Sequence, residues 1–168
     1  MSHNIRDSSK KETKVVFICT GNTCRSCMAE GIFRAINSQR EEKVSTLAIS
    51  RGIHAYEGDP ASEHSIKALQ TLWDIDISLH KAKMLNENDV KQADLLLTMT
   101  RQHRNVLRAR YSDRADGIFT LKEFAYPELD VNSSLLDISD PFGMPYRIYE
   151  SCAQEIYECI KIVLDKLK

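Results

Sequence analysis

The sequence predicts a single α/β domain built on a doubly wound, four-stranded parallel sheet flanked by helices. Four short apolar runs alternate with segments whose apolar residues recur at helical spacing, a pattern typical of βαβ units. No internal repeat or linker interrupts the 168 residues, a length that suits one domain with a substantial core. We expect the domain to span residues 14–168. Residues 1–13 are polar, lack the hydrophobic segment of a signal peptide, and are expected to form a flexible tail.

The first strand and the first helix enclose a short polar loop. Residues 15–19 form a strand-like apolar run, which indicates a buried parallel strand. Residues 26–40 then repeat apolar side chains at helical spacing. The loop between them, Cys19 to Arg25, leaves the strand at its carboxyl end, where ligands of open α/β sheets bind.

The second quarter of the chain continues this alternation. Residues 44–50 read as a second strand, which Arg51 and Gly52 interrupt. Residues 60–73 read as a helix with its apolar residues on one face.

The second half supplies the rest of the sheet and its covering helices. A short helix is predicted at residues 86–92, followed by the clearest buried strand at 93–99. Residues 101–110 read as a basic helix whose charges we expect to form a solvated face. The fourth strand is predicted at 118–121, and a long amphipathic helix at 147–167 closes the domain.

Composition excludes several classes of function. The chain is 42% hydrophobic and 28% charged, with a formal net charge of −1, so nothing indicates a nucleic-acid-binding protein. Its apolar runs are too short to span a membrane. Five cysteines, an odd number, indicate thiol chemistry in a reducing compartment, and we expect a cytoplasmic location. Cys24 and Cys27 form a C-x-x-C pair, but no second pair completes a zinc site, so no metal is expected.

The loop from Cys19 to Ser26 has the composition of a phosphate-binding loop. Gly21 and Asn22 tolerate left-handed backbone angles, which lets successive amides point inward as an anion-binding nest. The following helix adds free N–H groups and a partial positive charge at its N-terminus. Arg25 can bind two phosphate oxygens through its guanidinium fork.

The same electrostatic field favours a thiolate at Cys19. Ser26 can donate a hydrogen bond to this sulfur, and a thiolate facing a bound phosphoryl group is set for in-line displacement and a phosphocysteine intermediate. The alternative is a buried cysteine at the end of a strand, with Arg25 on the surface. The agreement of strand, loop, arginine, serine and helix favours the anion site.

A thiolate nucleophile needs an acid for its leaving group, and Asp140 is the candidate. It precedes Pro141, which keeps it out of the helical region, in a loop just before the last helix. On local sequence alone, a turn or helix-capping aspartate is an equal alternative.

The motifs CTGNTCRS at residues 19–26 and DPFG at residues 140–143 resemble those of the low-molecular-weight protein tyrosine phosphatase family. The resemblance extends over ISRG at 49–52 and ADLLLTMT at 93–100, and covers nearly the whole chain after Lys14. It implies a two-step hydrolysis of phosphorylated protein substrates without cofactor or metal. We expect a monomer.

The resemblance also implies roles for individual residues. Cys19 would be the nucleophile, Arg25 the phosphate clamp, and Asp140 the general acid and then the general base. The phosphate-binding loop would include Thr20, Gly21, Asn22, Thr23, Cys24 and Ser26. The resemblance favours Cys24 as a redox partner that forms a disulfide with the oxidised nucleophile, a role this position often has in the family, and the alternative is a packing residue beneath the loop.

Two positions make the chain similar to the protein arginine phosphatase branch of this family. Tyrosine-specific members usually carry an aliphatic residue at the position of Thr23 and aromatic residues after the Asp-Pro pair, where this chain has Phe142 and Gly143. The Thr23 hydroxyl can pair with a guanidinium N–H group, and Phe142 can stack on the guanidinium plane. A tyrosine phosphatase in which both positions are neutral remains the alternative.

The chain departs from the family pattern at two positions. Cys27 replaces the usual proline after the loop, and Arg51 replaces the usual alanine after the second strand.

Two further classes of function are alternatives. An arsenate reductase would need two further cysteines on a mobile segment, whereas Cys152 and Cys159 lie in the predicted last helix and are expected to pack in the core. A non-catalytic anion-binding module is the other alternative. No special role is predicted for the histidines at positions 54, 64, 80 and 103.

Overall fold

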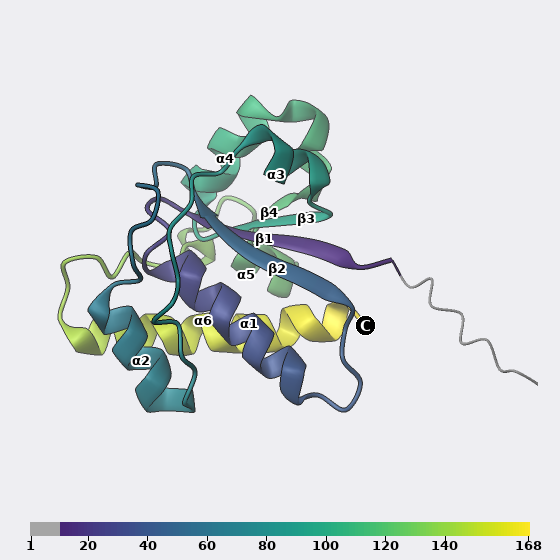
Figure 1. Cartoon of the computed structure of the whole chain (residues 1–168). Helices are drawn as coiled ribbons and strands as arrows, with labels where there is room; N and C mark the ends of the chain where they lie inside the picture. The colour runs from purple at the N-terminus through teal and green to yellow at the C-terminus, as the bar shows by residue number, and fades with distance from the viewer. Residues whose placement is uncertain (1–10) are drawn as a thin grey trace, which may run out of the picture.

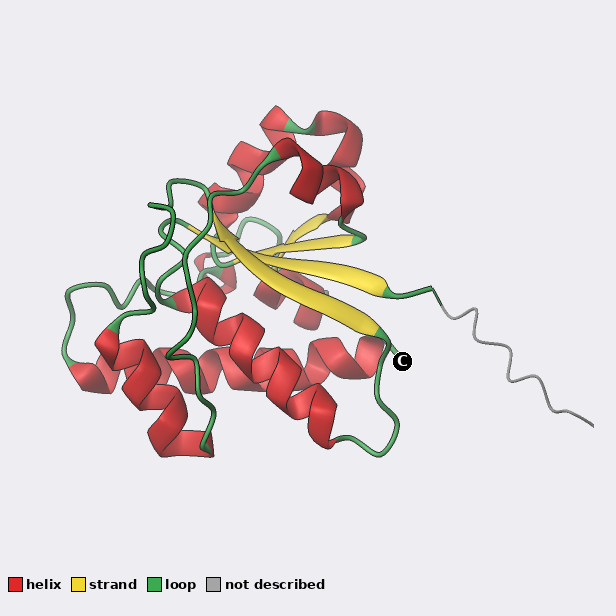
Figure 2. Cartoon of the chain, in the orientation of Figure 1, coloured by secondary structure: helices red, strands yellow, loops and turns green. Residues whose placement is uncertain are grey.

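The computed structural model describes residues 11–168 and contains one four-stranded, all-parallel sheet with the strand order β2-β1-β3-β4. Figure 1 shows this sheet between two layers of helices, and Figure 2 shows the same layers coloured by secondary structure. The predicted fold class is therefore confirmed. The strands are β1 (Thr13–Cys19), β2 (Thr46–Gly52), β3 (Leu95–Thr98) and β4 (Ile118–Thr120).

Helices cover both faces of the sheet. Those labelled α1, α2, α5 and α6 lie on one side and α3 and α4 on the other (Figure 1). The bounds are α1 (Arg25–Gln39), α2 (Glu63–Trp73), α3 (Glu87–Gln92), α4 (Arg101–Arg110), α5 (Leu121–Ala125) and α6 (Tyr146–Lys166). Two 3-10 turns, η1 (Ser112–Gly117) and η2 (Ser134–Leu136), complete the set.

Alternation along β1 divides the interior into two cores. Val15 and Phe17 point to the side of α1 and α6, whereas Val16 and Ile18 belong to the smaller core under α3 and α4. All four side chains are at most 1% exposed. Successive side chains of a strand point to opposite faces, so a central strand that is apolar throughout requires cover on both sides.

The carboxyl ends of β1 and β2 are joined tightly. Cys19 pairs with Gly52 in the parallel ladder, and the amides of Ile53 and His54 donate to the carbonyls of Cys19 and Thr20, both at 2.9 Å. A Cβ atom on Gly52 would lie 2.6 Å from the carbonyl oxygen of Thr20. Only glycine lets the end of β2 approach the loop after β1 this closely.

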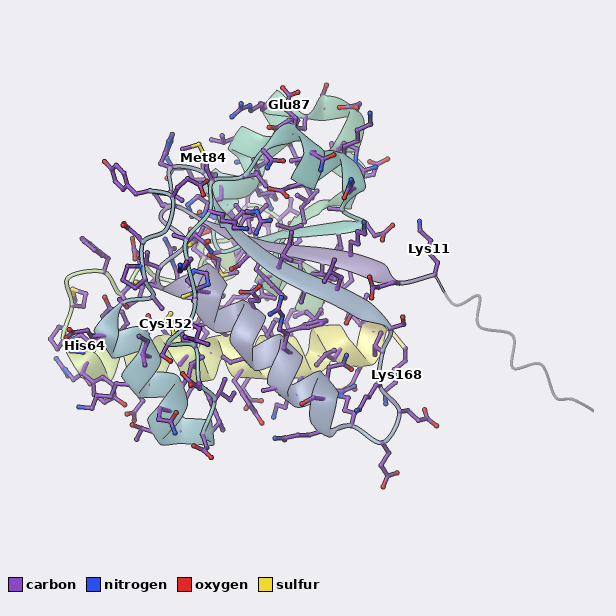
Figure 3. All side chains as sticks on the ribbon, viewed as in Figure 1. Lys11, His64, Met84, Glu87, Cys152 and Lys168 are labelled. Atoms are coloured by element: carbon purple, nitrogen blue, oxygen red, sulfur yellow. The ribbon has the colours of Figure 1, made fainter. Side chains whose placement is uncertain are left out.

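The start of the chain differs slightly from the prediction. β1 begins at Thr13, whose amide donates to the Ser45 carbonyl at 2.9 Å, so the sheet takes in a residue expected in the tail. Residues 1–10 of that tail lie outside the described residues. Lys11 and Lys168 line one shallow cavity and both lie on the side of the sheet where β1 begins (Figure 3).

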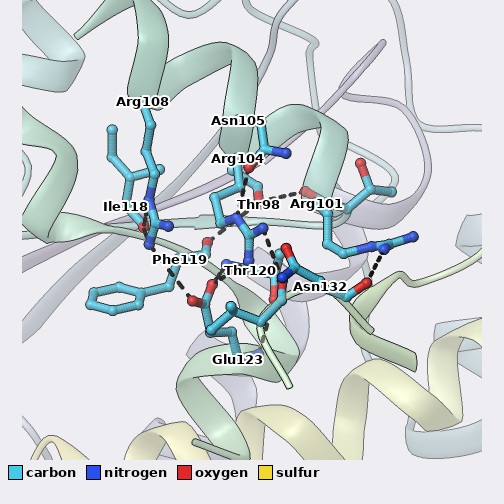
Figure 4. Close-up of polar contacts among 12 residues, drawn as sticks. Thr98, Arg101, Arg104, Asn105, Arg108, Ile118, Phe119, Thr120, Glu123 and Asn132 are labelled. Atoms are coloured by element: carbon cyan, nitrogen blue, oxygen red, sulfur yellow. Dashed lines mark hydrogen bonds and ion pairs between the residues drawn. The ribbon is translucent and has the colours of Figure 1, made fainter. Parts of the chain in front are cut away.

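The expectation that α4 presents a solvated basic face was wrong. Arg104 is 4% exposed and forms an ion pair with Glu123 of α5 at 3.0 Å (Figure 4). Arg108 donates to the carbonyl of Ile118 at 2.9 Å through Nε. Arg101 binds Asp137. The buried guanidinium of Arg104 and the half-buried ones of Arg101 and Arg108 are tolerated because each has acidic or carbonyl partners.

The short helix α5 was missing from the predicted elements. The predicted fourth strand ran to Leu121, which is instead the first residue of α5. A capping box fixes this change of direction, since Thr120 accepts from the amide of Glu123 while the Glu123 side chain accepts from the amide of Thr120. Five residues are too few to show a helical repeat in sequence. Within the described residues, no helix is long and apolar enough to cross a membrane.

Candidate active site

A cavity of about 350 Å³ opens at the carboxyl end of β1. It collects residues from the loop after β1, from the segment between β2 and α2, and from the segment before α6. They are Cys19, Thr20, Gly21, Thr23, Cys24, Arg25, His54, Tyr56, Asp59, Asp140 and Phe142. The three residues predicted to carry the chemistry, Cys19, Arg25 and Asp140, are therefore brought together, although Asp140 lies far from the other two in sequence.

The sulfur of Cys19 receives two polar contacts. Ser26 Oγ lies 2.9 Å from Sγ, and the backbone amide of Asn22 donates to Sγ at 3.3 Å. Cys19 is 3% exposed, so these groups replace water around the sulfur. This arrangement agrees with the predicted contact of Ser26.

Asn22 fixes the shape of the loop. It adopts the left-handed conformation, with φ of 58°, whereas Gly21 does not, although both were expected to tolerate it. Its side-chain amide donates to Ser26 Oγ at 2.8 Å and to Ser50 Oγ at 2.9 Å. Its side-chain oxygen accepts from the amide of Lys83 at 3.0 Å. These contacts hold the loop in its strained turn before any ligand binds.

The N-terminus of α1, which follows the loop, has no side-chain cap. The helices α2, α3, α4 and α5 each begin with a side-chain cap, from Ser62, Asn86, Thr100 and Thr120. In α1, by contrast, Cys24 at the N-cap makes no side-chain capping bond, and no acidic residue lies in the first turn. The first amides and the positive end of the helix dipole are thus available to an anion in the cavity.

Arg25 connects the loop to the acidic candidate. Its Nη1 group donates to the carbonyl of Ile138 at 2.9 Å, and Nη2 lies 3.5 Å from a carboxylate oxygen of Asp140. The Arg25 side chain is 5% exposed and that of Asp140 is 54% exposed. Asp140 also accepts from the amide of Phe142 at 3.1 Å, the turn expected of an aspartate before proline. The turn and the cavity position occur together, so the turn does not exclude Asp140 as the candidate acid.

The two candidate specificity residues also line the cavity. Thr23 has its hydroxyl oxygen 3.8 Å from Cys24 Sγ. Phe142 is 75% exposed, which leaves its ring free to contact a ligand at the mouth. Gly143 follows at φ of 74°, a conformation that favours glycine.

Sequence reasoning missed the roles of two histidines. His103 Nε2 lies 2.9 Å from the hydroxyl of Thr20, and His80 Nε2 lies 2.7 Å from the carbonyl oxygen of Asn22. Burial, followed by the positive charge of Arg25, lowers the pKa of His103 to about 4. Both residues therefore brace the loop from outside. No local motif marks them, because each reaches the loop only through tertiary packing.

Of the other four cysteines, only Cys24 lines the cavity. All five cysteines are free and buried, and Cys152 and Cys159 pack in the core from α6, as predicted. Figure 3 labels Cys152. Burial raises the pKa of Cys27 well above its ordinary value and those of Cys152 and Cys159 to about 12. Cys24 contacts Ser62 Oγ at 3.4 Å and Tyr149 Oη at 3.8 Å. Within residues 11–168, no group of three or more histidine, cysteine or acidic side chains is placed to hold a metal ion.

The two departures from the family pattern occupy defined places in the structure. Cys27 donates to the carbonyl of Cys24 at 3.1 Å, a contact that closes the first turn of α1 where a proline would rigidify it. Arg51 forms an ion pair with Asp89 at 2.8 Å and is not among the residues that line the cavity. Its guanidinium therefore belongs to the support of α3, not to the edge of the site.

Comparison with known proteins identifies the family. A model described as low molecular weight phosphotyrosine protein phosphatase matches residues 14–168. The chain belongs to this family. A protein-arginine-phosphatase from Bacillus subtilis (strain 168) is 35% identical to it, over 92% of this chain and 96% of the relative.

Solved structures show the same fold in this phosphatase family. A low molecular weight protein tyrosine phosphatase from T. tengcongensis is 42% identical with a TM-score of 0.83, over 92% of this chain and 99% of that one. The arginine phosphatase YwlE, solved as a mutant with a phosphorylated active site serine, is 31% identical, also with a TM-score of 0.83, over 92% and 95% of the two chains. The protein is thus a phosphatase of the cysteine-based family that acts on phosphorylated proteins, and its relatives carry both arginine and tyrosine names.

Proposed function

We propose that this phosphatase hydrolyses phosphoarginine in proteins through a phosphocysteine intermediate. The observation that carries the proposal is Thr23, a residue of the phosphate-binding loop that lines the cavity. A guanidinium carries N–H donors in a plane, and a hydroxyl acceptor satisfies a donor that an aliphatic wall would leave unpaired. The relatives named as arginine phosphatases support this assignment.

The first chemical step forms a phosphocysteine. The phosphoryl group binds to the loop amides, the open end of α1 and the Arg25 fork. Cys19 Sγ attacks phosphorus in line with the leaving nitrogen, so the S–P bond forms as the P–N bond breaks. The electron pair of the P–N bond goes to nitrogen, and Asp140 gives a proton to the leaving guanidine.

The second step regenerates the enzyme. Asp140, now a carboxylate, removes a proton from a water molecule that attacks phosphorus. The S–P bond breaks, the electron pair returns to Cys19, and inorganic phosphate leaves. No metal or cofactor takes part in this scheme. The proposed setting is the cytoplasm, where five free cysteines stay reduced, with the enzyme acting as a monomer.

A paired-substrate assay tests the assignment. Two peptides of one sequence, carrying phosphoarginine or phosphotyrosine at the same position, are compared by kcat/KM for the unmodified enzyme. We expect phosphoarginine to be preferred. Thr23→Val keeps the shape and removes the hydroxyl, and should lower kcat/KM for phosphoarginine about tenfold. Thr23→Ile should shift preference toward phosphotyrosine.

The second candidate is a tyrosine phosphatase with the same chemistry. It is favoured by the 42% identity to a chain described as a tyrosine phosphatase. In that case the unmodified enzyme prefers the phosphotyrosine peptide and Thr23→Val changes neither rate. Either result would refute the arginine assignment. The arsenate reductase alternative is not supported, because Cys152 and Cys159 are buried in the regular helix α6.

A further inference from the structure

The cavity has a second wall that the proposed chemistry does not use. Tyr56 and Asp59 lie in the segment between β2 and α2, and they line the same cavity as Cys19, Asp140 and Phe142. Tyr56 is 80% exposed, so its ring is free to contact a ligand. The sequence showed no motif at this segment.

Backbone hydrogen bonds fix the chain around Asp59. Its amide donates to the carbonyl of Tyr56 at 3.2 Å, and its carbonyl accepts from the amide of Ala82 at 2.7 Å. The amide of Gly58 donates back to the Ala82 carbonyl at 2.9 Å, with Gly58 at φ of 86°. Pro60 and Lys81 form an antiparallel bridge next to it. These contacts fix the backbone position from which the Asp59 side chain reaches the cavity.

The carboxylate itself has no ion-pair partner among residues 11–168, and the residue is exposed. Asp140, in contrast, is paired with Arg25. The cavity thus has two electrostatic zones. Its floor is positive because of Arg25 and the end of α1, and its mouth carries the carboxylates of Asp59 and Asp140.

A phosphorylated guanidinium matches these zones, since it has an anionic phosphoryl group at one end and a delocalised cation next to it. A phosphorylated phenol has the same anion attached to a neutral ring. We propose that Asp59 is a substrate-recognition residue that binds the guanidinium of phosphoarginine, with Tyr56 and Phe142 contacting the faces of the guanidinium plane. This proposal rests on the proposed function and names the residues that distinguish the cation from a phenol ring.

The test compares Asp59→Asn with the unmodified enzyme on three substrates. These are the free amino acid phosphoarginine and the paired phosphoarginine and phosphotyrosine peptides. Asp59→Asn should lower kcat/KM about tenfold for both phosphoarginine substrates, because an amide replaces a charge-assisted acceptor. The rate on phosphotyrosine should change less than about twofold. Asp59→Lys should lower the phosphoarginine rates further.

Controls separate recognition from folding and from flanking charges. Glu57→Gln changes a neighbouring carboxylate that does not line the cavity and should leave all three rates within about twofold. Competitive inhibition by inorganic phosphate should persist in Asp59→Asn, because phosphate needs only the floor. If the loss appears in the peptides but not with the free amino acid, Asp59 binds a residue flanking the target and the proposal is overturned.

The outcome is independent of which substrate the unmodified enzyme prefers. That preference decides the proposed function, whereas the change in the ratio of phosphoarginine to phosphotyrosine rates decides the role of Asp59. Equal losses on both amino acids, or no loss on either, would overturn the inference even if the enzyme prefers phosphoarginine.

Discussion

Arg101, the first residue of α4, binds Asp137 through both its backbone amide, at 2.7 Å, and its guanidinium, at 2.9 Å from Nη2. Asp137 lies three positions before Asp140, and Arg25 binds the carbonyl of the intervening Ile138. Two arginines from separate helices therefore anchor the segment that carries the proposed general acid. This relationship gives α4 a function beyond covering the sheet.

Loss of this anchor should slow catalysis without weakening phosphate binding. Arg101→Ala leaves the backbone contact to Asp137 and removes the guanidinium, so Asp140 is held less firmly. We expect kcat to fall about fivefold on phosphoarginine and much less on 4-nitrophenyl phosphate, whose leaving group needs little protonation. Arg101→Lys should recover part of the loss. Equal losses on both substrates would indicate a general structural effect, and so would a weakened inhibition by phosphate.

The proposed roles of Cys19 and Asp140 predict different kinetic losses. Cys19→Ser should abolish turnover while still binding phosphate, because the loop and Arg25 remain. Asp140→Asn should lower kcat by about 10² or more, since the leaving group loses its proton donor. Steady-state rates with both substrates, together with phosphate binding, check this prediction. An Asp140→Asn enzyme with unchanged rates would assign the acid to another residue.

His103 should make the protein less stable in mild acid. Its pKa is about 4 in the folded protein, below the ordinary value of 6.5, so the unfolded chain takes up a proton first as the pH falls. Stability is then fully present above about pH 6.5 and is lost between about pH 6.5 and pH 4, by on the order of 3 kcal/mol. Protonation would also place an N–H on Nδ1, which has no hydrogen-bond partner among the described residues.

Denaturant unfolding at several pH values checks this prediction. The His103→Gln variant should lose the slope between pH 6.5 and pH 4 while keeping a polar group beside Thr20. Asp94 does not interfere in this window. The hydrogen bond from the Lys14 amide lowers the pKa of Asp94, so its contribution is lost only at lower pH, below about 4. An unchanged slope in His103→Gln would contradict the assignment.

We expect oxidation to affect only the two cysteines that line the cavity, Cys19 and Cys24. Peroxide is expected to convert Cys19 to a sulfenic acid, which the Cys24 thiol then attacks to form a disulfide with loss of water. Activity should return on addition of a dithiol. In Cys24→Ser it should be lost irreversibly, as mass spectrometry of the Cys19 peptide would show. Cys27→Ser is the matched control and should recover fully, because burial raises the pKa of Cys27 and keeps it protonated. Failure of this control would make Cys27 the resolving thiol.

The predicted site residues came from two stretches that are each contiguous in sequence, the loop after β1 and the segment from Asp140 to Phe142. Cys19 to Ser26 form one strand end, loop and helix start, so local chemistry alone indicated an anion site. His103 and His80 could not be recognised, because their contacts depend on how α4 and the segment before α3 pack against the loop.

The direction of the α4 side chains was mispredicted for a related reason. Arginine side chains usually face solvent unless buried groups can accept their hydrogen bonds. The partner of Arg104, Glu123, lies on α5, a helix too short to show periodicity in sequence. The strands, in contrast, could be predicted. A short continuous apolar run is typical of a strand buried on both faces when such runs alternate with helical segments along the chain.

The close approach at Gly52 separates a fixed part of the molecule from a variable one. The backbone amides of Ile53 and His54, just after β2, donate hydrogen bonds to carbonyl groups of the catalytic loop. Any larger side chain at Gly52 would displace that loop. Beyond His54, Tyr56 and Asp59 also line the cavity, but no backbone amide of residues 55–61 donates to the catalytic loop. This stretch is therefore a natural unit to exchange between relatives. Chimaeras made there should retain the recipient's chemistry, and any change in the ratio of phosphoarginine to phosphotyrosine rates should add to the preference set by Thr23.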